Sequence, residues 1–148
     1  RTVFPVPLAQ ASAWDPDLAQ RTARAAAVEA TASGVHWTFA PMVDVTRDPR
    51  WGRVVEGAGE DPFLGSALAT ALVHGFQGAG APDVSSMLAT AKHFVAYGAA
   101  EGGRDYNVAD LSERTLREVY LPPFQASMQS CRPSTSWPAF PCTAIPPC

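Results

Sequence analysis

The residues best suited to hold a polar ligand lie in one short segment. Positions 47–53 read RDPRWGR and combine three arginines with an aspartate and a tryptophan. Pro49 and Gly52 favour a structured loop over a helix face. Guanidinium groups offer a rigid fork of donors to hydroxyls and carboxylates, and an indole offers a flat apolar face. The segment is typical either of a loop that holds a sugar or of a surface turn that Asp48 stabilises.

A second polar group follows further along the chain. Lys92 and His93 lie at the expected C-terminal end of a strand, and Arg104 follows two glycines. Adjacent strand residues point to opposite faces, so both side chains reach one pocket only if the backbone twists. Alone, they would be a solvated strand end and a hydrogen-bonded core histidine. Together with the arginine loop and Arg104, they favour a binding site.

Hydrolysis by acid–base chemistry needs two carboxyl groups. Asp61 is expected to cap a helix, Asp48 to pair with an arginine, and Glu56 and Glu60 to lie in loops or at the surface. Asp44, at an expected strand end, is the best remaining candidate. One acid makes no pair, so the spacing of residues alone does not establish hydrolysis.

Composition argues against several other classes of protein. The 148 residues carry a net charge of −3, without the basic excess of a nucleic-acid binder. No apolar run approaches the roughly 20 residues that span a bilayer. The glycine-rich nucleotide-binding motifs are missing, and His36, His74 and His93 are scattered, so we expect no cofactor and no metal.

The chain alternates helical and strand-like patterns. Asp15-Pro16 and Asp61-Pro62 are N-cap signals, since an aspartate precedes a proline at the first helical position. Asp110 or Ser112 is expected to cap a third helix, which Pro122-Pro123 should kink or end. The patterns predict these elements: helices 17–33 and 63–76, a third helix to about 124, and strands 36–42 and 87–94.

This order predicts an α/β fold with parallel strands and crossover helices. Both polar loops follow strands, and in α/β barrels such loops form the active-site face. A complete barrel typically needs about 250 residues, so we expect part of a (β/α)8 TIM-type barrel, incomplete in this chain.

The composition changes at about Ser130. Residues 131–148 are rich in proline and contain all three cysteines, Cys131, Cys142 and Cys148. Their spacing matches no zinc site. We therefore expect one domain over 1–130 and a tail over 131–148 that is read out of frame or is disordered. The start at Arg1, without a methionine, suggests a processed or incomplete product.

The motifs, taken in order, resemble the N-terminal domain of glycoside hydrolase family 3. The similarity covers about residues 1–130, and it is closest to bacterial periplasmic or secreted β-glucosidases. It rests on these segments: FAPMVDV at 39–45, the arginine loop, Glu56, GEDP at 59–62, KHFVAYG at 92–98, EGGRDYN at 101–107, LSERTLRE at 111–118 and YLPPF at 120–124.

The resemblance implies a barrel domain followed by an α/β sandwich, and hydrolysis of terminal β-linked glucosides or xylosides with retention, without a cofactor. It implies that four side chains hydrogen-bond the sugar: Arg53, Lys92, His93 and Arg104. Asp48 and Glu56 would support them, and Trp51 would pack beneath the loop rather than stack on sugar. Arg47 and Arg50 would brace it.

The family's catalytic nucleophile and acid/base lie in motifs that this sequence does not contain. We therefore expect no catalytic residue in this chain, and a β-glucoside or oligosaccharide as the partner that it helps to bind. Two alternatives stay open: a non-catalytic sugar-binding or interaction module, and an α/β domain of unrelated function. The sequence leaves sugar, linkage and oligomeric state undefined.

Overall fold

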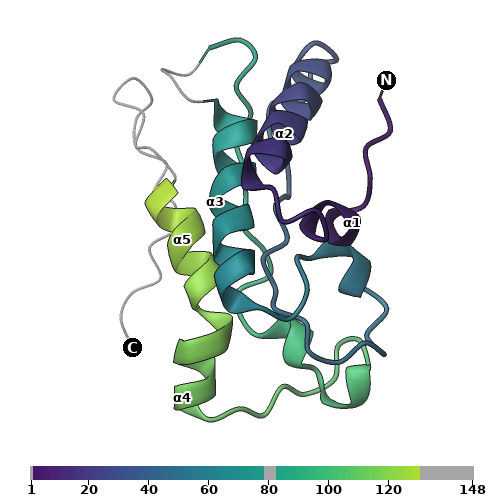
Figure 1. The fold of residues 1–148 in the computed structure, drawn as a ribbon, viewed down its shortest axis with the longest axis vertical. Helices are drawn as coiled ribbons and strands as arrows, with labels where there is room; N and C mark the ends of the chain where they lie inside the picture. Colours follow the sequence, from purple (N-terminus) through teal and green to yellow (C-terminus); the bar gives the residue numbers. More distant parts are fainter. Residues whose placement is uncertain (1, 79–82, 131–148) are drawn as a thin grey trace.

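A computed structural model describes residues 2–78 and 83–130 of the chain. Helices dominate this part, and the remaining segments are loops and turns (Figure 1). The α-helices are α1 Pro7–Ala11, α2 Pro16–Thr31, α3 Pro62–Gln77, α4 Glu113–Thr115 and α5 Pro122–Ser130. The other helical turns are η1 Val54–Glu56, η2 Tyr97–Ala99, η3 Glu101–Gly103 and the π-helical η4 Leu116–Tyr120.

The two long helices begin where their capping residues predict. The Asp15 carboxylate accepts a hydrogen bond from the backbone N–H of Leu18 at 2.9 Å. Asp61 accepts one from Phe63 at 2.9 Å. Each side chain satisfies an amide that the helix itself leaves unpaired. Both predicted N-caps are thus confirmed.

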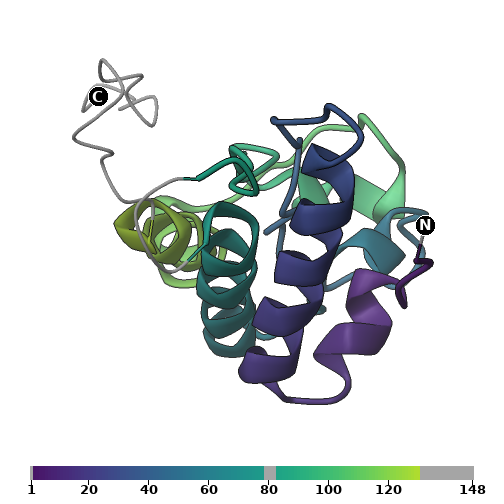
Figure 2. The same ribbon diagram turned by 90° about the horizontal axis from the view of Figure 1, so that it is seen from above.

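Helices α2, α3 and α5 lie side by side in a row (Figure 2). Alanines dominate the buried face of α2, and the glycine at position 75 of α3 lies against it. An ideal Cβ on Gly75 would be 2.5 Å from the Ala23 Cβ and 2.5 Å from the Gln20 carbonyl oxygen. The two helices therefore meet in direct backbone contact, which only glycine permits at this point.

The two expected strands are not regular strands. Segments 36–42 and 87–94 instead pair through two isolated parallel bridges, Trp37 with Leu88 and Met42 with Lys92. Within the described residues each segment has only the other as an extended neighbour, and Pro41 has no N–H to donate to a ladder. The parallel direction agrees with the expectation. The described residues contain no regular β-strand, so the partial barrel is not confirmed.

The third helical region is broken, as its prolines predict. Ser112 is the N-cap, and its hydroxyl accepts a hydrogen bond from the Thr115 N–H at 3.1 Å. The helix passes through the π-helical η4, and α5 then begins at Pro122. The kink was expected from the proline pair, but the π-helical turn was not.

The bridged segments leave large apolar side chains exposed. Trp37, Phe39, Leu88 and Phe94 are each more than half exposed, between 54% and 62%. An isolated surface apolar residue is ordinary, but here the rings of Trp37 and Phe39 are in contact, with centroids 4.9 Å apart, and Leu88 is bridged to Trp37, so exposed apolar side chains gather on the paired segments. Among the described residues, no helix is long and apolar enough to cross a membrane. The expected tail, 131–148, lies outside the described residues.

Candidate functional site

Arg53 is the centre of the candidate site. It follows the turn of the arginine loop and precedes η1, which carries Glu56 one helical turn later. The Arg53 Nε and Nη2 donate to the two Glu56 carboxylate oxygens at 2.7 and 2.8 Å. This forked pair fixes the guanidinium plane, and the hydrogen bonds from Arg53 lower the pKa of Glu56.

His93 connects Arg53 to a buried carboxylate. Its Nε2 lies 3.3 Å from Arg53 Nη2. On the other side of the ring, Nδ1 lies 2.8 Å from Asp44 Oδ2, and the same oxygen accepts the His93 backbone N–H at 2.9 Å. The Asp44 side chain is fully buried, and this burial raises its pKa, although the hydrogen bonds from His93 oppose the shift.

The ring of Tyr97 packs against both Arg53 and His93. The Arg53 Cζ lies 5.3 Å from the ring centroid, within the range of a cation–π contact. The His93 ring meets Tyr97 edge to face at 5.0 Å. Partial burial and a hydrogen bond to Asp105 raise the pKa of Tyr97 to about 12, so the phenol stays neutral.

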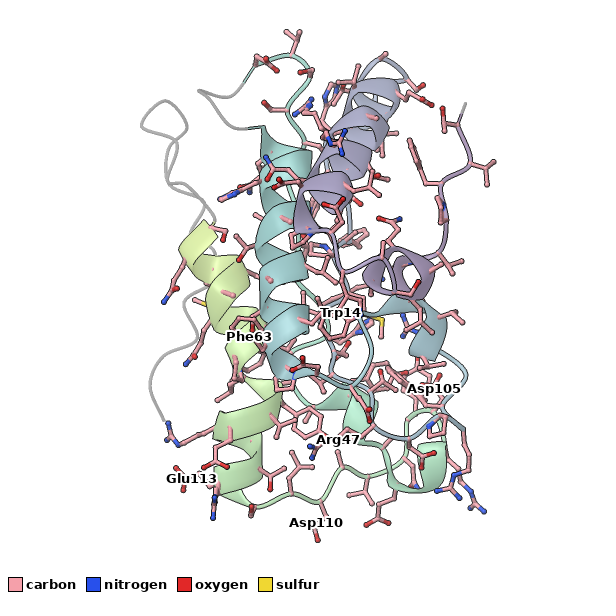
Figure 3. The ribbon with its side chains drawn as sticks, in the orientation of Figure 1. Trp14, Arg47, Phe63, Asp105, Asp110 and Glu113 are labelled. Carbon is pink, nitrogen blue, oxygen red and sulfur yellow. The ribbon has the colours of Figure 1, made fainter. Side chains whose placement is uncertain are left out.

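Asp105 joins the arginine loop to the later glycine-rich loop. One of its oxygens accepts from the Trp51 Nε1 at 2.9 Å and from the Tyr97 hydroxyl at 2.5 Å. Trp51 is 1% exposed, so it packs beneath the loop as expected. An added Cβ on Gly103 would lie 2.8 Å from the Trp51 amide nitrogen. Both loops therefore form one unit on the loop-bearing lower half of the molecule, where Figure 3 labels Asp105.

The other expected site residues are placed less centrally. Lys92 is half-buried, and its charge helps to lower the pKa of Glu56, after the larger effect of Arg53. Arg104 is exposed, and the described contacts do not join its side chain to Arg53 or His93. The structure thus brings Lys92 towards the cluster and leaves Arg104 at its edge.

Asp48 pairs with Arg50, as expected for a loop brace. The Arg50 Nε and Nη2 donate to its oxygens at 2.9 and 2.6 Å, and these hydrogen bonds lower the pKa of Asp48 to about 2. Neither residue reaches Arg53 through the described contacts. Any support that Asp48 gives to a bound sugar stays a prediction.

Three contributors escaped the sequence analysis: the link from Asp44 to His93, the ring of Tyr97, and the carboxylate of Asp105. Each acts through a partner distant in the sequence, and no spacing rule reveals such contacts. In chemical terms the cluster offers charged and neutral hydrogen-bonding groups held in fixed geometry, which suits a polyhydroxylated ligand. Among the described residues, no group of three or more acidic, histidine or cysteine side chains could hold a metal.

Comparison with known proteins assigns this arrangement to a family. Residues 1–134 match the glycosyl hydrolase family 3 N terminal domain. The chain belongs to glycosyl hydrolase family 3. It is 45% identical over 130 residues to a periplasmic β-glucosidase of Salmonella typhimurium, covering 88% of this chain and 17% of that protein. It is 46% identical over 131 residues to a β-xylosidase of Formosa agariphila, covering 86% of this chain and 18% of that protein.

Solved structures of β-glucosidases resemble this chain as well. The crystal structure of a β-glucosidase from Listeria innocua superposes with a TM-score of 0.85 and 49% identity, over 88% of this chain and 18% of that one. That enzyme has also been crystallised with glucose. Glycosyl hydrolase family 3 is a hydrolase family, and these relatives are β-glucosidases and β-xylosidases. The chain spans less than a fifth of the length of each of them.

Proposed function

We propose that this chain supplies the sugar-holding side of a β-glycoside hydrolase that acts on terminal β-linked glucosides. The observation that carries the proposal is the connected cluster of Arg53, Glu56 and His93 above Tyr97. A neutral sugar offers hydroxyl groups and no charge, and charged donors with fixed orientation hydrogen-bond hydroxyls more strongly than neutral ones. Preformed geometry also reduces the ordering cost of binding.

Lys92 and Arg104 complete the proposed site. Lys92 carries a positive charge beside Glu56, and Arg104 lies in the loop that Asp105 joins to the arginine loop. Asp48 braces that loop through Arg50. The exposed side chain of Arg104 can reorient without breaking a described contact. We therefore expect it to turn towards a sugar that is bound at the cluster.

Bond cleavage in this proposal belongs to the remainder of the protein. The carboxylates nearest the cluster are already engaged, because Glu56 is held by Arg53, and Asp44 is fully buried against His93. A retaining mechanism needs two carboxyl groups about 5 Å apart that flank the glycosidic bond. We place the parent protein in the periplasm or outside the cell, as for the Salmonella relative.

The partial barrel also remains part of the proposal. Each long helix precedes one of the two parallel bridged segments, in the repeating order of a (β/α)8 barrel. Further strands would cover the exposed side chains of Trp37, Phe39, Leu88 and Phe94. Hydrogen exchange tests this. We expect little protection at 36–42 and 87–94 in the isolated chain, and strong protection there would count against a missing barrel.

The function is tested with the purified chain. We expect glucose to bind weakly, seen as chemical-shift changes, and an aryl β-glucoside to remain uncleaved. Lys92→Ala should abolish binding, while Arg117→Ala, an exposed change on η4, should not alter it. Turnover by the chain alone would contradict the proposed division of labour. Absence of glucose binding in a folded chain would contradict the sugar site itself.

A further inference from the structure

One oxygen of Asp44 holds His93 at two points. Asp44 Oδ2 accepts the backbone N–H of His93 at 2.9 Å and faces its ring Nδ1 at 2.8 Å. An ionised carboxylate can only accept hydrogen bonds. The Nδ1 atom must therefore carry a proton. The backbone contact fixes the position of the residue, and the ring contact fixes the rotation of the imidazole.

The opposite ring nitrogen meets a group with the reverse requirement. Nε2 lies 3.3 Å from the Nη2 of Arg53. A guanidinium only donates, so Nε2 must present its lone pair. A proton on Nε2 would set N–H against N–H and would place an imidazolium beside a cation. Asp44 requires a proton on Nδ1 and Arg53 disfavours one on Nε2, so the two contacts together select the neutral Nδ1-protonated form.

We propose that Asp44 is a positioning residue that holds His93 as the Nδ1-protonated tautomer, so that Nε2 accepts from Arg53 and helps to orient that guanidinium towards a ligand hydroxyl. Asp44 itself cannot touch a ligand, because its side chain is 0% exposed, whereas that of His93 is 32% exposed. This deepens the proposed sugar-binding function and depends on it only for the identity of the ligand. A carboxylate that hydrogen-bonds one ring nitrogen commonly fixes the tautomer of a functional histidine in this way.

The tautomer decides how Arg53 is held. With its lone pair on Nε2, His93 accepts a hydrogen bond from Arg53 Nη2, which also donates to Glu56 at 2.8 Å. The reverse tautomer would set N–H against N–H and would push the guanidinium out of this position. A ligand that depends on Arg53 should then bind about tenfold more weakly, as expected for the loss of one hydrogen bond.

The first test reads the tautomer directly in the whole chain. Long-range ¹H–¹⁵N correlation spectra distinguish protonated from unprotonated ring nitrogens, and His93→Gln identifies the His93 signals among the three histidines. We expect the wild-type ring to carry its proton on Nδ1. A proton on Nε2 of wild-type His93 would overturn the proposal, and this result needs no variant that might misfold.

Two substitutions separate positioning from general packing. Asp44→Asn keeps an oxygen acceptor, and its amide NH₂ takes the place of Oδ1, which has no described partner. It should retain the Nδ1–H tautomer and near-normal glucose affinity. Asp44→Ala removes the acceptor that fixes the ring, so the imidazole can rotate away from Arg53, both tautomers should appear, and glucose affinity should fall about tenfold. An unchanged tautomer in Asp44→Ala would refute the role.

The outcomes also separate this inference from the proposed function. If wild-type His93 has the expected tautomer but glucose does not bind, the sugar site fails and the positioning by Asp44 stands. If glucose binds with affinity that Asp44→Ala leaves unchanged, the sugar site stands and the positioning role fails.

Discussion

The contact between α2 and α3 makes a sharp prediction for Gly75→Ala. The added methyl group would lie 2.5 Å from the Ala23 Cβ and 2.5 Å from the backbone oxygen of Gln20. Ordinary carbon contacts are about 3.5–4.0 Å, so the helices must separate by about 1 Å. Backbone atoms of a long helix cannot yield locally, and the change must therefore spread along the interface.

Two opposing effects set the size of the result. Overpacking a buried site costs about 1–3 kcal/mol, and a contact with rigid backbone favours the upper end of that range. Replacement of a helical glycine by alanine contributes about 1 kcal/mol in the opposite direction. We expect Gly75→Ala to lower the free energy of unfolding by about 2 kcal/mol.

Gly65→Ala is the matched control, because Gly65 is also buried in α3. Its added Cβ would meet only the Pro123 Cγ, at an ordinary 3.6 Å. This variant should gain about 1 kcal/mol from helix propensity alone. Urea unfolding followed by circular dichroism measures both. With a slope of about 2 kcal/mol/M, the two midpoints should differ by about 1.5 M. A Gly75→Ala chain as stable as Gly65→Ala would refute the packing explanation.

Three further predictions concern the loops and the surface. Gly103→Ala places a methyl group 2.8 Å from the Trp51 amide, at a φ of +67°, so the Trp51 indole N–H should exchange faster with solvent. Hydrogen bonds from Tyr97 and then Trp51 lower the pKa of Asp105 below its ordinary 3.8. Asp105 therefore stabilises the fold above that pH and loses this effect as the pH falls through its folded-state pKa. The stability difference between wild type and Asp105→Asn should close in acid, and a gap that persists there would contradict this. Arg114→Ala breaks only an exposed ion pair and should change unfolding free energy by less than about 0.5 kcal/mol.

Local features of the fold could be predicted from the sequence. Asp15 and Asp61 act on amides two or three residues away, so an aspartate before a proline was a sufficient signal. The break at Pro122 was equally local, since proline cannot continue a helix through its missing N–H. Family resemblance correctly added that Trp51 is buried.

Contacts between distant residues could not be predicted in the same way. Asp44 and His93 are 49 residues apart, and Trp51 and Asp105 are 54 apart. Nothing in the local pattern specifies which of several acids meets which ring. The prediction of two regular strands was wrong for a related reason. Regular parallel strands depend on neighbouring strands on both sides, and the described residues do not provide them.

The shared carboxylate of Asp105 has a consequence for engineering. It accepts hydrogen bonds from Trp51 of the arginine loop and from Tyr97 of the later loop, so the conformation of each loop depends on the other. A chimera that imports one loop from a relative would inherit a donor without its acceptor, or the reverse. Chimeras designed to change ligand specificity should therefore exchange both loops together. In a chimera with only one exchanged loop, we expect Arg53 to be displaced.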